Sequence, residues 1–144
     1  MNNKIVSLEE TVENAWSDID VQLRMRFDLV DNLVNTVKWY AKHEKDTFKE
    51  VVEARNRFAS ATDVKSKAEA DNMLTASLKS LFALSEAYPE LKSNENFLSL
   101  QTELSDIENK IASARRYFNA ATREYNTLIK QFPADILFHK TPKD

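Results

Sequence analysis

The residues best suited to metal binding or catalysis are the two histidines, His43 and His139. The stretch "HEKDT" starts at His43 with the first two residues of a zinc-protease motif, but Thr47 stands where that motif needs its second histidine. A di-iron bundle needs a glutamate three residues before each histidine, where this chain has Tyr40 and Ile136. The chain also has no cysteine. We therefore expect no metal site and no cofactor.

Carboxylates could supply an acid–base pair in a groove, and six are placed on the expected helices: Asp18, Asp20, Glu44, Glu50, Glu108 and Glu124. With 30% charged residues, long helices also bring such side chains together as ordinary ion pairs, for example Asp106 with Lys110 four residues on. Serine and threonine nucleophiles would need a nearby base, and the histidines are few. We predict a non-enzymatic protein without catalytic residues.

Arginines could form a patch for phosphate or lipid head groups, or they could simply solvate the helices: Arg24, Arg26, Arg55, Arg57, Arg115, Arg116 and Arg123. Acidic residues are interspersed among them, and the net charge is -3. Nucleic-acid binding needs a basic face that displaces counterions. We expect no nucleic-acid partner.

The absence of glycine excludes several classes of nucleotide enzyme. Phosphate-binding loops use glycine because the backbone must approach the ligand closely and adopt positive φ. Tight turns between strands use it as well. A chain of 144 residues without glycine is therefore expected to be a single domain of long helices.

Apolar residues recur at helical spacing along the whole chain. One row runs from Ile5 to Val30 and continues in phase to Phe58. Asp28 could cap a new helix inside this row, but an unbroken helix explains the pattern almost as well. Ser66, with Glu69 three residues on, predicts a capping box that opens a third segment. That segment should end before Pro89.

The last expected helix begins at a cap on Ser93 or Asn94 and ends before Pro133. Its apolar residues alternate at steps of three and four, which predicts a seam packed against antiparallel neighbours: Phe97, Leu100, Leu104, Ile107, Ile111, Ala114, Phe118, Ala121, Tyr125, Leu128 and Phe132. Glu108 and Arg115 lie beside this seam and can pair with a neighbouring helix. Asn109 and Arg116 point away from it.

Two long stretches resemble the LemA family of bacterial proteins: "AWSDIDVQLRMRFDLVDNLVNTVKWYAKHE" and "EAYPELKSNENFLSLQTELSDIENKIASARRYFNAATREYNTLIKQFP". The resemblance covers almost the whole chain and implies an antiparallel bundle, with no enzymatic activity. It also implies a single membrane-spanning helix just upstream, and hence a cell-membrane location for the full-length protein and a soluble domain here. The chain departs from the family in having Asp31 in place of proline and Trp39 in place of glycine.

Together these observations predict an all-α fold, an antiparallel up-and-down bundle of three to four long helices. We expect one bundle domain over residues 1–133 and a C-terminal tail over residues 134–144. Residues 1–8 should be helical.

Trp39 is expected to point away from the core, because it lies about 200° around the helix from Val37 and Ala41. A candidate interaction surface therefore contains Trp39, Tyr40, His43, Asn109, Arg115 and Arg116. The alternative for Trp39 is that its ring covers the stems of neighbouring basic residues. We expect a protein partner for this surface. An alternative function is a sensor that binds a small anion or lipid head group in a groove near Arg115 and Arg116.

Overall fold

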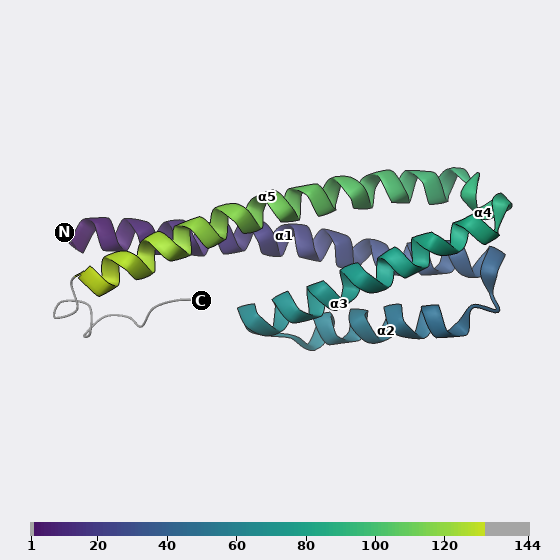
Figure 1. Cartoon of the computed structure of the whole chain (residues 1–144), viewed down its shortest axis with the longest axis horizontal. Coiled ribbons are helices and arrows are strands. Elements are labelled where there is room, and N and C mark those ends of the chain that lie inside the picture. The colour runs from purple at the N-terminus through teal and green to yellow at the C-terminus, as the bar shows by residue number, and fades with distance from the viewer. Residues whose placement is uncertain (1, 132–144) are drawn as a thin grey trace. The chain divides into compact units, whose positions relative to one another are not determined.

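The computed structural model describes residues 2–131. Within them every regular element is a helix, so the predicted all-α class is confirmed (Figure 1). The elements are α1 (Asn2–Ala41), α2 (Lys45–Ser60), α3 (Val64–Ala83), the 3-10 helix η1 (Leu84–Ala87), α4 (Pro89–Lys92) and α5 (Glu95–Gln131). Phe132, Pro133, His139 and the predicted tail lie outside the described residues.

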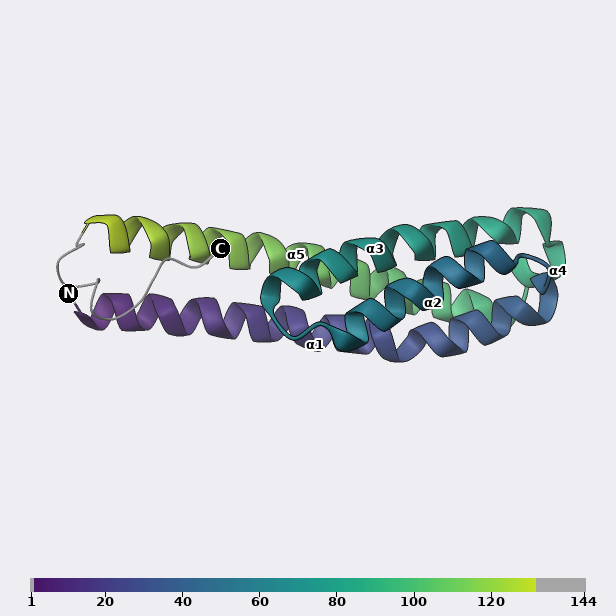
Figure 2. The same cartoon turned by 90° about the horizontal axis from the view of Figure 1, so that it is seen from below.

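The chain divides into two compact units, and α1 and α5 contribute residues to both. The second unit covers residues 23–107, and its successive long helices run in alternating directions (Figure 1, Figure 2). α2 packs directly against α3. The helices of this unit enclose one apolar core, formed by Val30, Leu33, Val34, Val37, Ala41, Phe48, Val51, Ala54, Leu74, Leu78, Leu81, Leu91, Phe97, Leu100 and Leu104.

The first unit is described over residues 2–22 of α1 and 108–131 of α5. The rings of Trp16 and Phe118 lie 5.7 Å apart between centroids, and the Tyr125 hydroxyl donates to Glu9 Oε2 over 3.3 Å. Because numbers rise along one helix as they fall along the other, the two segments are antiparallel. Residues 2–8 are helical, as predicted.

The predicted seam of α5 is confirmed at its described positions. Ala114 is half-buried, and the other seam residues from Phe97 to Leu128 are buried. The row on α1 is buried at Val12, Ile19, Leu23 and Val30. Burial along one side of each helix supplies most of the free energy that keeps long helices folded.

Of the two alternatives that the sequence left open at Asp28, the unbroken helix is confirmed. α1 continues through Asp28 without a break, because its apolar row is buried on both sides of that residue. The chain turns instead at residues 42–44, where no apolar residue falls between Ala41 and Phe48. A turn there allows α2 to return Phe48 to the core.

The predicted capping box at Ser66 is wrong. α3 begins two residues earlier, and the Asp63 carboxylate caps it by accepting the Ser66 N–H over 2.6 Å. This hydrogen bond lowers the pKa of Asp63, since it favours the ionised form. Ser66 therefore lies inside the first turn and cannot be the cap.

The helix end expected before Pro89 and the cap expected for the last helix both agree with the structure. Tyr88 leaves the helical conformation before Pro89, and Pro89 opens α4. The Phe97 N–H donates to Asn94 Oδ1 over 2.9 Å, so Asn94 caps α5. Without glycine, α2 ends in an extended residue, Ala61, rather than in a left-handed one.

Candidate interaction surface

Trp39 is the most exposed of the large apolar side chains in the described part of the chain. It lies near the end of α1 in the second unit and is 82% exposed. The predicted exposure is therefore confirmed, and the angle from Val37 and Ala41 explains it. A tryptophan side chain left in water suggests a contact with another molecule. A role in binding stays a prediction.

Tyr40, next to Trp39, is half-buried and tied to the start of α5. The Asn94 side-chain amide donates to the Tyr40 hydroxyl over 2.9 Å. On the same end of this unit, the Tyr88 hydroxyl donates to Glu44 Oε1 over 3.1 Å, and this bond raises the pKa of Tyr88. Tyr40 is therefore engaged within the fold. His43 is exposed in the turn after α1.

A second polar contact joins α1 to α5 beside Trp39. The Asn96 amide donates to Thr36 Oγ1 over 2.8 Å and to Asn32 Oδ1 over 3.4 Å. Thr36 lies three residues before Trp39, so the two side chains are neighbours on the helix surface. Sequence reasoning missed Asn32 and Asn96 because their partners are on different helices.

The other three candidate residues belong to the first unit, so the six do not form one surface within either unit. Asn109 and Arg116 are exposed on α5. Arg115 is half-buried, and burial lowers its pKa from the usual arginine value. Arg115 also takes part in an interaction within the protein. Arg115 is therefore not a free cation available to bind an anion.

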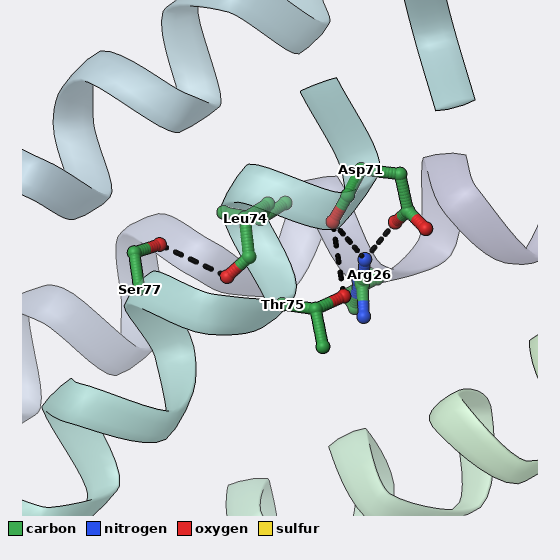
Figure 3. A network of polar contacts seen from close by, with 5 residues as sticks. All are labelled: Arg26, Asp71, Leu74, Thr75 and Ser77. Carbon is green, nitrogen blue, oxygen red and sulfur yellow. Dashed lines mark hydrogen bonds and ion pairs between the residues drawn. The ribbon is translucent and has the colours of Figure 1, made fainter. Parts of the chain in front are cut away.

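The grouping of Arg26 with surface arginines is wrong. Its guanidinium forms an ion pair with Asp71 of α3, and Figure 3 shows it meeting both the carboxylate and the main-chain carbonyl of Asp71. Thr75 donates to the same carbonyl over 2.9 Å. The sequence carried a signal for this pair, because Arg26 falls on the apolar row between Leu23 and Val30.

Two further arginines of the proposed patch make contacts within the second unit. Arg55 forms an ion pair with Asp31, with Nε 2.9 Å from Oδ1, and its guanidinium carbon lies 4.8 Å from the centre of the Phe27 ring. Arg24 lies on the same ring at 5.7 Å. Both contacts are cation–π interactions, which hold these guanidinium groups against the protein surface.

Residues 2–131 hold no cluster of metal-ligating side chains and no helix suited to crossing a bilayer. No three histidine, aspartate or glutamate side chains there gather as a metal site. In the same residues, no helix is long and apolar enough to cross a bilayer.

The helices and their packing define this molecule as an all-α bundle protein. The chain belongs to the LemA family, whose model matches residues 15–141. This confirms the resemblance seen in the sequence.

Among curated relatives, the chain is 29% identical to magnetosome protein MamQ of Magnetospirillum gryphiswaldense. It is 25% identical to MamQ 1 and MamQ 2 of Paramagnetospirillum magneticum. Each of these matches covers 94% of this chain but 59% of the relative, so the chain spans about three fifths of the length of these proteins.

Proposed function

We propose that this chain is a non-enzymatic interaction domain, tethered to a membrane in its full-length protein, that binds a protein partner through the surface around Trp39. The observation that carries the proposal is the 82% exposure of this indole. Trp39 is not packed in the core of its unit. The other tryptophan, Trp16, contacts Phe118 within the first unit. Tryptophan is among the side chains that contribute most to binding when a partner covers them.

The surroundings of Trp39 favour binding over catalysis. Tyr40 and Glu44, which could take part in proton transfer, are hydrogen-bonded to Asn94 and Tyr88. These bonds fix the end of α1 and so hold the indole on a rigid support. Tryptophan also has few rotatable side-chain bonds, so ordering it on binding costs little conformational entropy.

Membrane tethering is supported by family membership and by the relatives named as magnetosome proteins. It is tested by fractionating cells that express the full-length protein and washing the membranes at alkaline pH. An integral tether keeps the protein in the membrane pellet. Release into the wash would overturn this part of the proposal.

Partner binding is tested by placing a photoreactive amino acid at position 39 of the full-length protein in membranes. Illumination should give a covalent adduct with a protein. Position 105 is the matched control, since Ser105 is an exposed residue of α5 in the same unit. If position 39 gives no more protein adduct than position 105, the proposal is overturned.

The sensor alternative has weaker support, because Arg115 already takes part in an interaction. A thermal-shift screen with inorganic phosphate and anionic lipid head groups tests it. A ligand that binds only the folded state raises the melting temperature.

A further inference from the structure

The solvent-facing side of α1 in the second unit carries a row of exposed side chains, here called the outer row. Its members are spaced three and four residues apart: Met25, Asp28, Asn32, Asn35, Trp39 and Lys42, the last just after the helix end. This is the spacing at which two helices pack along a shared seam. The middle of the row has no charge, in a chain in which 30% of residues are charged.

Part of the outer row is held in place by the fold. Asn96 donates to Asn32 Oδ1 and to Thr36 Oγ1, which restricts the Asn32 amide and the surface beside Trp39. Side chains that are ordered before binding lose less entropy on association. Asn32 and the surface beside Trp39 are therefore ordered before a partner binds.

A surface made of amides and an indole is complementary to itself. A carboxamide both donates and accepts hydrogen bonds, so an asparagine can pair with its own copy, as a lysine or glutamate cannot. A two-fold dimer places the same surface on both sides of the interface. We propose that the outer row binds a second copy of this chain, with the two α1 helices antiparallel and the two-fold axis at Asn35.

The charges at the two ends of the row favour this arrangement. Asp28 lies seven residues before Asn35 and Lys42 lies seven residues after it. A two-fold axis at Asn35 therefore places Asp28 of each copy opposite Lys42 of the other. A parallel pairing in register would instead bring like charges together. In the same antiparallel arrangement each Trp39 covers the turn of the other helix that holds Asp31 and Asn32.

This inference rests on the proposed function, in which the Trp39 surface binds protein, and it names that protein. Antiparallel pairing sends the N-termini of the two α1 helices in opposite directions. Copies tethered upstream of α1 in one membrane can therefore pair in this way only with α1 lying along the membrane surface.

Charge reversal tests the arrangement in solution. The chain should change from one copy to two as its concentration rises in sedimentation velocity. Asp28→Lys and Lys42→Asp should each weaken association about tenfold, since each dimer then holds two like-charge contacts. An equimolar mixture of the two variants should recover dimers, because both contacts become attractive in the heterodimer. Within one chain the two positions lie about 21 Å apart along the helix, so no internal pair explains the recovery.

A cysteine variant tests the position of the two-fold axis. The natural chain has no cysteine, so Asn35→Cys carries a single thiol. Mild oxidation should link two copies of this variant, because the axis brings position 35 next to itself. Ser105→Cys, also exposed in the second unit, should stay unlinked. Equal linking at both positions would overturn the axis at Asn35.

Failure of self-association is distinguishable from failure of the proposed function. A chain that stays monomeric at every concentration, or variants that do not recover dimers on mixing, would overturn the second copy as the occupant. The proposed function then survives only if the photoreactive group at position 39 gives an adduct with a different protein. An adduct between two copies of the chain supports both.

Discussion

Arg26 of α1 and Asp71 of α3 form an ion pair whose side chains are only 4% and 3% exposed. The Arg26 guanidinium also donates to the Asp71 carbonyl over 3.1 Å. Both charges have been removed from water inside the second unit, a cost that their mutual attraction and hydrogen bonds must offset. The pair therefore favours one register of α3 against α1, because in any other register a buried charge would lose its partner.

Arg26→Met should destabilise the chain by about 3–5 kcal/mol, because it leaves the Asp71 carboxylate buried without its cation. The joint replacement Arg26→Met with Asp71→Leu should recover most of that loss. Urea unfolding measures both. Lys92→Met is the control, since its pair with Glu86 is exposed and should be worth less than about 1 kcal/mol. Equal losses in the two single variants would contradict the importance of burial.

Phe118→Ala should destabilise the chain by about 3–5 kcal/mol through lost burial and the cavity left behind. Phe118 is 8% exposed and its ring contacts Trp16 in the first unit. The adjacent Tyr117 is 59% exposed, so Tyr117→Ala is a matched control that should change stability by less than about 1 kcal/mol. Denaturant melts in which the two variants behave alike would show that the seam contributes little.

Asp63→Ala should lower the melting temperature, because it removes the acceptor for the Ser66 N–H at the start of α3. Asp63→Asn keeps an oxygen acceptor and should retain most of the stability. Glu69→Ala tests the capping box that the sequence had indicated, and we expect it to leave the melting temperature nearly unchanged. A larger loss at Glu69 than at Asp63 would favour that box after all.

Tyr125 should make stability fall at alkaline pH. Burial and the neighbouring Glu9 raise its pKa to about 12, above the value near 10 of an exposed tyrosine. The folded state therefore holds the proton more tightly than the unfolded state. Stability from this preference is fully present below about pH 10 and is lost as the pH rises toward about 12. Thermal melts of the wild type and Tyr125→Phe should diverge in that range. Parallel pH profiles would contradict this prediction.

The sequence by itself determined the all-helical class and the buried side of the long helices, although not every helix end. The seam of α5 follows from the spacing of its own residues, and the exposure of Trp39 follows from its angle to Val37 and Ala41. The family was recognisable for the same reason, because its long helical stretches are continuous in the chain. Each of these properties is local to one helix or one stretch, and helical geometry converts spacing directly into direction.

Only the tertiary structure decided which polar residues meet. Arg26 and Asp71 are 45 residues apart, and Tyr40 and Asn94 are 54 apart, so no helical period relates them. The six residues of the candidate surface fall in two units, with Trp39 in one and Arg115 in the other. The sequence did not show this, because helical spacing does not say which residues of different helices lie near each other. The start of α3 was also mispredicted, because Asp63 caps this helix by accepting the Ser66 N–H and Ser66 lies inside the first turn. Side-chain partners depend on which helices face each other and in what register, and that is set by burial of the whole core.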